Sequence, residues 1–124
     1  MPPQVPRMPR DLLERFARLL TTDTDACAGL FALDAVYRAR LGSCEVILVG
    51  REQIRRFLAH VPRQIAVQAL EPQPEQGAST AIWRGDLVLS ATDLAPRRQP
   101  VRFAVQAGRF RSFEQLAPSA NGTA

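Results

Sequence analysis

The stretch 101-VRFAVQAGRFRSFEQL-116 decides the fold class of this chain. From Val101 to Gln106, large apolar residues occupy every second position, which is the period of a half-buried β-strand. Ala107 and Gly108 follow as a two-residue turn of the kind that joins antiparallel strands, and the strand pattern resumes from Arg109 to Leu116. This part of the chain is therefore predicted to form a β-hairpin.

Two further strands are predicted upstream of the hairpin. Gln64 to Leu70 alternates with the same period, and Ser79 to Ser90 is a longer strand that contains Trp83. Pro96 and Pro100 predict a loop after the long strand, because proline interrupts a strand ladder.

The long strand is predicted to have one apolar face and one mixed face. Gly85 on its apolar face indicates either a bulge that bends the strand or a position where a neighbouring side chain fills the space. The apolar face carries Ala81, Trp83, Gly85, Leu87 and Leu89, and the mixed face carries Ile82, Arg84, Asp86, Val88 and Ser90.

The first half of the chain shows the period of amphipathic helices. A first helix is predicted from Asp11, a second is capped by Thr22 and Asp23, and a third follows Gly50 and is ended by Pro62. Their apolar positions are Leu12, Leu13, Phe16, Leu19 and Leu20 in the first, Ala26, Cys27, Leu30 and Phe31 in the second, and Ile54, Phe57, Leu58 and Val61 in the third.

One strand, Asp34 to Leu41, is predicted between the second and third helices, with a turn at Gly42-Ser43. Helices gathered at the start and hairpin-linked strands at the end favour an α+β fold with a mostly antiparallel sheet. We expect a flexible lead over residues 1–9, a single domain over 10–117 and a flexible tail over 118–124.

Composition excludes several classes of protein. Hydrophobic residues make up 46% of the 124 residues, enough for a packed core, and no apolar run is long enough to span a bilayer. The net charge of +4 comes from 16 arginines without a single lysine, and these form no long basic run, so we expect no nucleic-acid partner. The arginine- and proline-rich start lacks the apolar centre of a secretion signal, so we expect a cytoplasmic protein without a membrane partner.

Cysteine and histidine usage argues against a metal site. Cys27 and Cys44 match no metal-ligand spacing, and His60 is the only histidine. We expect both thiols to be reduced, Cys27 to pack in the core, and no cofactor to be needed.

Four segments together resemble the nuclear transport factor 2-like superfamily, which includes SnoaL-like cyclases, ketosteroid isomerases and limonene epoxide hydrolases. They are Asp23-Thr24-Asp25, Phe31-Ala32-Leu33-Asp34-Ala35-Val36-Tyr37-Arg38, Gly50-Arg51-Glu52-Gln53-Ile54 and Gly108-Arg109-Phe110. The resemblance extends over residues 10 to 117. It implies a cystatin-like curved sheet wrapped around the N-terminal helices as a cone with a pocket.

The resemblance also implies where catalytic residues would lie. In the ketosteroid isomerases an aspartate base, a tyrosine and a protonated aspartate do the chemistry, and the matching positions here are Ala39, Phe16 and Val101. None of these side chains can transfer a proton, so isomerase chemistry of that kind is not expected. Asp34 and Asp93 are expected at a strand start and in a turn, not in the carboxylate–arginine arrangement of the epoxide hydrolases.

We therefore expect no catalytic residues and a pocket for a small apolar or aromatic molecule. Tyr37 is either a pocket donor or a core tyrosine, Trp83 is either a stacking platform or core, and His60 is expected to cap the third helix. The expected pocket walls are Phe16, Leu20, Phe31, Tyr37, Trp83, Leu87, Phe103 and Phe113.

Two alternatives remain open. The chain could be an isomerase- or cyclase-type enzyme that uses Tyr37 or His60, or a protein-interaction module with a solid core. A homodimer is expected through the convex face of the sheet, where Ile82, Val88, Ala104 and Phe110 would lie among arginines.

Overall fold

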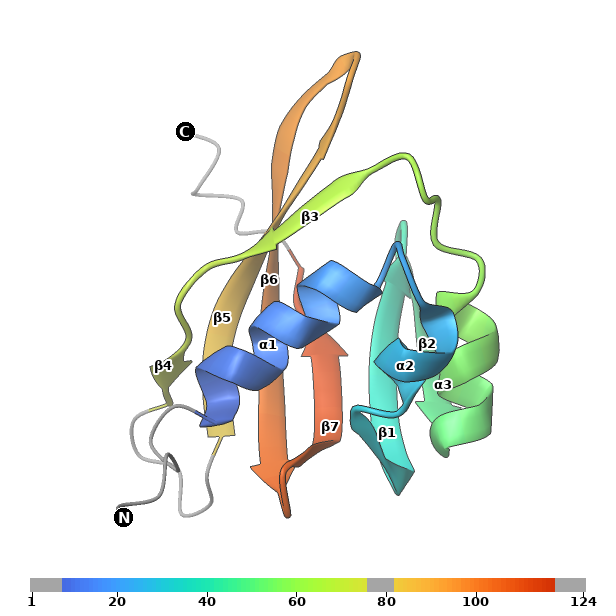
Figure 1. Cartoon of the computed structure of the whole chain (residues 1–124), viewed down its shortest axis with the longest axis vertical. Coiled ribbons are helices and arrows are strands. Elements are labelled where there is room, and N and C mark those ends of the chain that lie inside the picture. Colours follow the sequence, from blue (N-terminus) through green and yellow to red (C-terminus); the bar gives the residue numbers. More distant parts are fainter. Residues whose placement is uncertain (1–7, 76–81, 118–124) are drawn as a thin grey trace.

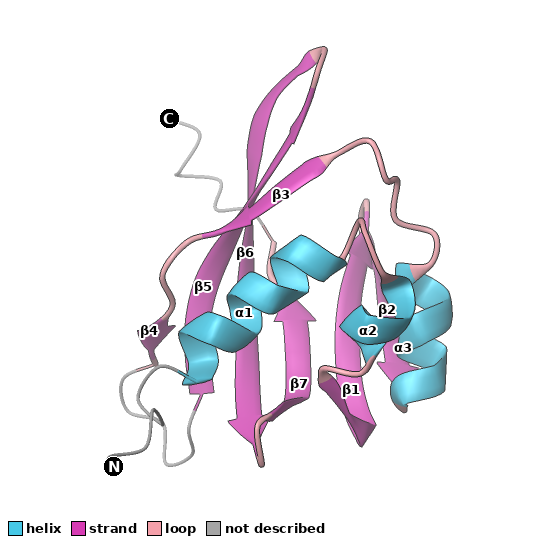
Figure 2. Ribbon diagram, viewed as in Figure 1, coloured by secondary structure: helices cyan, strands magenta, loops and turns pink. Residues whose placement is uncertain are grey.

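The computed structural model describes residues 8–75 and 82–117 (Figure 1). Three helices and seven strands alternate only in the first half of the chain, and the second half contains strands alone (Figure 2). In chain order the elements are α1 (Met8–Leu19), α2 (Thr24–Ala28), β1 (Phe31–Leu41), β2 (Cys44–Val49), α3 (Arg51–Leu58), β3 (Ala66–Ala69), β4 (Gln73–Pro74), β5 (Ile82–Ala91), β6 (Leu94–Gln106) and β7 (Arg109–Gln115).

The strands form one mixed sheet in the order β2-β1-β7-β6-β5-β3, with β4 paired to β5. Among the described strands, β1 and β7 run parallel and the other pairs are antiparallel. The helix α1 crosses one face of the curved sheet, with α2 and α3 beside β1 and β2 (Figure 1). The predicted α+β architecture, with a curved and mostly antiparallel sheet around N-terminal helices, is confirmed.

Several predicted elements are confirmed with small changes in their bounds. The helix α1 begins at Met8, three residues before Asp11, and accommodates Pro9 in its first turn, where proline removes no helical hydrogen bond. Asp23 caps α2 as predicted, because its carboxylate accepts a hydrogen bond of 3.0 Å from the Ala26 amide. The Ala107-Gly108 turn has positive φ at both residues, as a tight hairpin turn requires.

Three predictions about elements are wrong. Phe31, expected on the second helix, is the first residue of β1, because α2 ends at Ala28. Cys44–Val49, not predicted as a strand, forms the edge strand β2. The predicted proline loop is part of β6, where Pro100 pairs with Asp86 and its carbonyl still accepts a hydrogen bond of 2.9 Å from the Leu116 amide.

A register shift in β7 also corrects the position of Phe110. Between Ala104 and Val105 the partner on β7 moves from Ser112 to Phe110, so that Arg111 is an extra residue, as in a β-bulge. The bulge turns both Phe110 and Phe113 towards the helices. Phe110 is therefore fully buried in the core and does not lie on the convex face.

The core is an aromatic cluster that contains all six phenylalanines and Tyr37. The ring centroid of Phe16, on α1, lies 4.7 Å from that of Phe113 and 6.0 Å from that of Phe110, which it meets edge to face. Such tilted and edge-to-face pairs are favourable arrangements for aromatic rings. The cluster fixes α1 on the concave face of the sheet and fills most of the interior of the cone.

Gly85 belongs to this packing and does not mark a bulge, since its pairing with Val101 is regular on both sides. A Cβ atom at this position would lie 3.0 Å from the Leu13 Cδ2 atom and 3.5 Å from the Pro72 Cβ atom. Of the two interpretations of Gly85, the structure supports the neighbouring side chain that fills the space. Leu13 can reach the sheet because this residue has no side chain.

No helix among residues 8–75 and 82–117 has the length and apolar character needed to cross a membrane. The expected lead lies mostly outside the described residues, as does the expected tail, and so do Ser79 and Ala81 of the predicted long strand.

Candidate functional site

A cavity of about 140 Å³ opens at one end of the cone, and we call it the mouth cavity. It lies where α1, β1, α3 and β7 all end, beneath β5 and β6. Its lining residues are Phe16, Leu20, Tyr37, Arg40, Leu41, Phe57, Val61, Leu87, Leu89, Gln99 and Gln115.

The floor and walls of the mouth cavity are apolar. Phe16 and Leu20 face it from successive turns of α1, and Leu87 and Leu89 face it from alternate positions of β5. Leu41 lies at the rim with 54% of its surface exposed, so the cavity communicates with solvent. Apolar walls with a few polar groups are typical of sites for small molecules.

Two glutamines supply polar groups, and their backbone contacts fix which end of each amide is free. The Gln115 Oε1 atom accepts a hydrogen bond of 2.9 Å from the Arg40 backbone amide, and within residues 8–75 and 82–117 its NH₂ group is left as a free donor. The Gln99 Nε2 atom donates to the Pro100 and Leu116 carbonyls at 2.7 and 2.9 Å, and among the described residues the Gln99 Oε1 atom is left as a free acceptor.

Tyr37 adds a hydroxyl group to this set. Its ring is almost completely buried, and burial raises its pKa above the usual range, with a smaller contribution from Cys27, so the hydroxyl stays protonated. No hydrogen bond joins this hydroxyl to another residue of the described segments. Every fully buried side-chain nitrogen or oxygen in these segments has a hydrogen-bond partner. Since the Tyr37 hydroxyl has none there, it is in contact with open space. We call Tyr37, Gln99 and Gln115 the polar rim.

Arg40 is the one charged residue of the lining, and the strand directs its side chain elsewhere. Its neighbours Ala39 and Leu41 share the inward face of β1 with Tyr37, and successive strand residues point to opposite faces. Arg40 therefore borders the mouth cavity through its backbone amide, and its Cβ atom is directed to the face of β1 opposite Tyr37. Apart from Arg40, the residues that line the cavity carry no formal charge.

The predicted pocket walls fall into two groups. Four of them, Phe16, Leu20, Tyr37 and Leu87, line the mouth cavity. Phe31, Phe103 and Phe113 are buried in the aromatic cluster instead, and Trp83 is half-buried beside Pro74 of β4.

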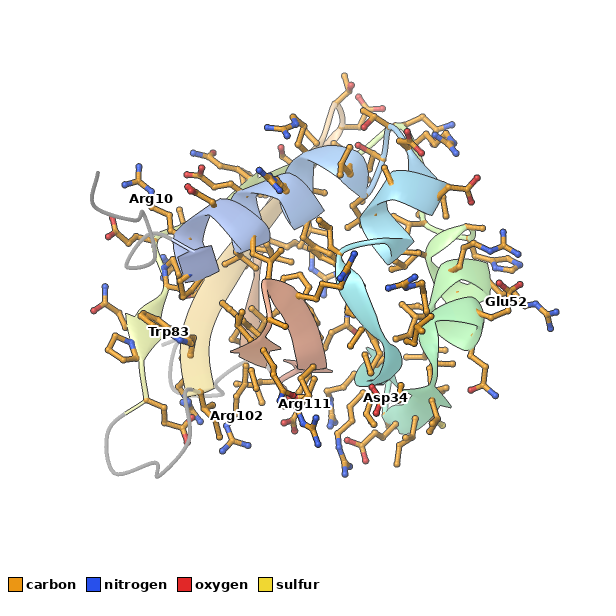
Figure 3. All side chains as sticks on the ribbon, turned by 60° about the horizontal axis from the view of Figure 1, so that its bottom comes forward. Arg10, Asp34, Glu52, Trp83, Arg102 and Arg111 are labelled. Carbon is orange, nitrogen blue, oxygen red and sulfur yellow. The ribbon has the colours of Figure 1, made fainter. Side chains whose placement is uncertain are left out.

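The positions that correspond to isomerase catalytic residues all point inward. Phe16, Ala39 and Val101 are buried core residues, as expected from strand and helix period. Asp34 lies within β1 and projects from the face of the sheet opposite α1 (Figure 3), so it is in the strand and not at its start. His60 Nδ1 lies 2.9 Å from the Arg56 carbonyl, which confirms its predicted role at the end of α3.

The other two candidate carboxylates also lie outside the mouth cavity. Asp86 is on the convex face of β5, 4.0 Å from the Arg98 guanidinium, and Asp93 is in the turn between β5 and β6. In residues 8–75 and 82–117 no three histidine, cysteine or acidic residues come together as a metal site.

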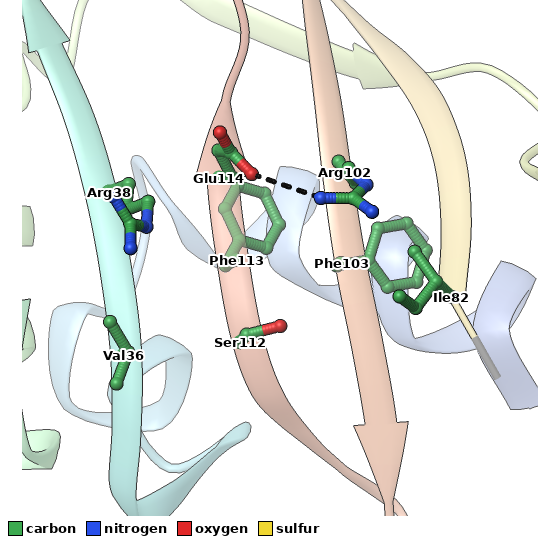
Figure 4. A pocket seen from close by; sticks show the side chains of 8 residues that line it. All are labelled: Val36, Arg38, Ile82, Arg102, Phe103, Ser112, Phe113 and Glu114. Atoms are coloured by element: carbon green, nitrogen blue, oxygen red, sulfur yellow. Dashed lines mark ion pairs between the residues drawn. The ribbon is translucent and has the colours of Figure 1, made fainter. Parts of the chain in front are cut away.

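A second depression, of about 170 Å³, lies on the convex face of the sheet (Figure 4). Arg102 approaches Glu114 at 3.7 Å at its edge, and Arg102 also donates hydrogen bonds of 2.8 and 2.9 Å to Glu75. The hydrogen bond from Arg102 lowers the pKa of the Glu75 carboxyl, so this network is charged at neutral pH. The depression is lined by Val36, Arg38, Ile82, Arg102, Phe103, Ser112, Phe113 and Glu114.

Sequence reasoning missed most of the polar rim. Gln99 fell in a predicted loop, and only its pairing with Leu87 on β5 reveals that it faces inward. Gln115 shares the strand parity of Phe113, and this was the one signal in the sequence that could have identified it.

No family model matches this chain, and no curated protein sequence matches it. Solved structures do match. An NTF2-like protein from Anabaena variabilis superposes with a TM-score of 0.69 at 17% identity, over 91% of this chain and 88% of that one. The epoxide hydrolase/cyclase-like enzyme SalBIII, with a role in pyran ring formation in salinomycin, has a TM-score of 0.70 at 14% identity, over 91% and 92%. A computationally designed 17-OHP binder has a TM-score of 0.65 at 18% identity, over 86% and 88%.

Proposed function

We propose that this chain, which has the cone fold of the nuclear transport factor 2-like superfamily, binds a small, largely apolar ring compound in the mouth cavity. The observation that carries this proposal is an apolar cavity with an open rim at one end of the cone. A cavity of about 140 Å³ is close in size to an engineered apolar cavity of roughly 150 Å³ that accepts benzene. One ring therefore fits, while a larger ligand would have to extend past Leu41.

Binding without the acid/base chemistry of the ketosteroid isomerases is part of the proposal. The side chains that face the mouth cavity include no carboxylate and no imidazole, and Tyr37 is the only titratable one. Since general acid–base catalysis works best with a group whose pKa is near the working pH, a tyrosine with a raised pKa is poorly suited to it. The designed 17-OHP binder, which is similar in fold, is a protein made for binding.

Toluene titrated into the uniformly ¹⁵N-labelled protein tests this proposal. We expect saturable shifts in the backbone amides of residues that line the mouth cavity, and none at the convex depression. Leu41→Trp places an indole at the rim and is expected to weaken toluene binding at least about fivefold by steric exclusion. Leu33→Trp is the matched control, because Leu33 is 74% exposed and does not line the mouth cavity.

Two results would contradict the proposal. Absence of any saturable shift would favour the alternative of a protein-interaction module with a solid core. Catalytic turnover of a ketone substrate that Tyr37→Phe abolishes would favour an isomerase- or cyclase-type enzyme. Native mass spectrometry of gently purified protein complements the titration, because a retained ligand adds its mass to that of the chain.

We also propose a homodimer through the convex face. Ile82, Val88 and Ala104 lie there among ion-paired arginines, and a face of such mixed polarity is typical of isologous contacts. Ala104→Glu, between Ile82 on β5 and Ser112 on β7, is expected to convert a dimer to a monomer in light scattering. A wild-type monomer at micromolar concentration would refute the dimer.

A cytoplasmic location completes the proposal. Cys27 and Cys44 are both free thiols, one buried and one exposed, as is common in a reducing compartment. Detection of the protein in the soluble cytoplasmic fraction of its native cells would support this location, and recovery from an extracellular fraction would contradict it.

A further inference from the structure

We infer that the ligand of the mouth cavity is an uncharged ring compound whose polar edge carries a hydrogen-bond acceptor beside a donor, as in a carboxamide or a lactam. This inference rests on the proposed function and adds the chemical class of the ligand to it. It follows from the free ends of the polar rim, Tyr37, Gln99 and Gln115, and from the absence of charge on the side chains that face the described cavity.

The polar rim presents both kinds of hydrogen-bonding group in fixed orientations. The Gln115 NH₂ group is a donor and the Gln99 Oε1 atom is an acceptor, because the other end of each amide is bound to backbone. Neither amide can flip without breaking those contacts. A ligand edge with an acceptor and a donor is therefore complementary to the two glutamines.

The two glutamines are neighbours in the sheet. Gln115 pairs with Val101 across β6 and β7, and Gln99 is two residues before Val101 on the same strand. Gln99 also donates to the carbonyl of Leu116, the residue after Gln115. Both side chains thus line the same end of the cavity, where one polar group of a ligand can approach both.

Charge selects against an ionised ligand. A carboxylate placed at the polar rim would lose its hydration among uncharged groups, since Tyr37, Gln99 and Gln115 are neutral and strand alternation directs the Arg40 side chain to the opposite face of β1. It would also approach the free Gln99 Oε1 acceptor. An uncharged amide avoids both costs and retains hydrogen bonds to the polar rim.

Three small ring compounds of similar size separate the effect of a donor–acceptor edge from the effect of ligand charge. Toluene has no polar group, benzamide has a neutral donor–acceptor edge, and benzoate has an anionic one. Each is titrated into the full-length ¹⁵N-labelled protein at neutral pH, with the backbone amides and the Gln115 side-chain NH₂ signals followed together. We expect benzamide to bind about threefold to tenfold more tightly than toluene, as one or two net hydrogen bonds allow. We expect benzoate to bind at least about tenfold more weakly than benzamide.

Two near-isosteric variants test the residues themselves. Gln115→Glu keeps an acceptor for the Arg40 amide but removes the donor, and Tyr37→Phe removes only the hydroxyl. Each is expected to reduce the preference for benzamide over toluene about threefold or more. Gln106→Glu is the matched control at the opposite end of the β6–β7 pair, where Gln106 accepts from Arg111 at 2.7 Å, and is expected to leave the preference unchanged.

The outcomes distinguish this inference from the proposed function. If toluene shifts the cavity amides and benzamide binds no better, or benzoate binds best, the inference is overturned and the proposed function stands. If both variants keep the full preference for benzamide, the polar rim is not its origin and the inference also fails. If no compound shifts the cavity amides, the proposed function fails and the inference fails with it.

Discussion

Tyr37 on β1 and Phe113 on β7 lie opposite each other in a parallel strand pair, and their rings stack with centroids 5.2 Å apart at an angle of 15°. The ring centroid of Phe113 also lies 4.7 Å from that of Phe16 and 5.1 Å from that of Phe110, so Phe113 is central to the aromatic cluster. Tyr37 connects that cluster to the wall of the mouth cavity. The same stack therefore supports both the core and the proposed site.

Truncation of this stack is expected to destabilise the fold strongly. Phe113→Ala removes a fully buried ring and should lower the free energy of unfolding by about 3–5 kcal/mol, measured by urea denaturation. Phe57→Ala is the matched control, because Phe57 packs at a tilted angle against Tyr37 from the half-buried edge of the cluster, and should cost about 1–2 kcal/mol. Equal losses for the two variants would show that Phe113 is not central to the core.

A second prediction concerns the close approach of α1 to β5. Gly85→Ala places a Cβ atom 3.0 Å from Leu13 Cδ2, and Leu13 is fully buried, so this side chain must move. We expect a net loss of about 1 kcal/mol, since the overpacking cost exceeds the gain from replacing glycine in a strand. The loss should shrink in a Leu13→Val background, which a double-mutant cycle of unfolding free energies measures. An additive cycle would mean that the two residues do not interact.

Much of this architecture could be predicted from the sequence, because the spacing of apolar residues along a helix or strand indicates which of its faces is buried. The inward positions of Tyr37, Ala39 and Phe103 follow from alternation alone, and all three are buried. Alternation fails where the chain inserts an extra residue, and Arg111 does so in β7, which moves Phe110 to the other face. Local sequence contains no signal for that insertion, because it depends on the partner strand.

The polar rim could not be predicted from the sequence, again because it depends on strand pairing. Proline at positions 96 and 100 predicts a loop, yet β6 continues through both, because a strand residue can pair through its carbonyl without an amide hydrogen. Gln99 therefore belongs to the sheet. Its role also depends on Leu116, which is distant in sequence and adjacent only across β6 and β7.

Arg51 is predicted to stabilise the irregular start of β1. Its Nε and Nη2 atoms donate to the Phe31 carbonyl at 2.9 and 2.7 Å, next to the register shift between Phe31 and Val36. Arg51→Lys cannot reproduce this paired donation and should lower the free energy of unfolding by about 1–2 kcal/mol. Arg56→Lys, at an exposed ion pair with Glu52, should change it by less than about 0.5 kcal/mol. Similar small effects at both positions would argue against a structural role for Arg51.

The last prediction is a loss of stability at alkaline pH. Burial, with a smaller contribution from the Asp23 carboxylate, raises the pKa of the Cys27 thiol from its ordinary value of 9.0 to about 12, and burial raises the pKa of Tyr37 as well. At a pH between the ordinary pKa of each group and its raised pKa in the folded state, the unfolded chain binds fewer protons than the folded one. Each group therefore stabilises the fold fully below its unfolded pKa and loses that contribution as pH rises towards the folded value.

The absence of lysine from the chain makes this titration unusually simple, because few other groups change charge between pH 9 and 12. We expect the free energy of unfolding to fall by about 1.4 kcal/mol per pH unit for each of the two groups within its own window. Cys27→Ala should remove the first part of the decline, which starts near pH 9, while Cys44→Ala should not, since Cys44 is exposed. Urea titrations at stepped pH measure both. A wild-type stability that stays constant to pH 11 would show that neither Cys27 nor Tyr37 is protected from ionisation by the core.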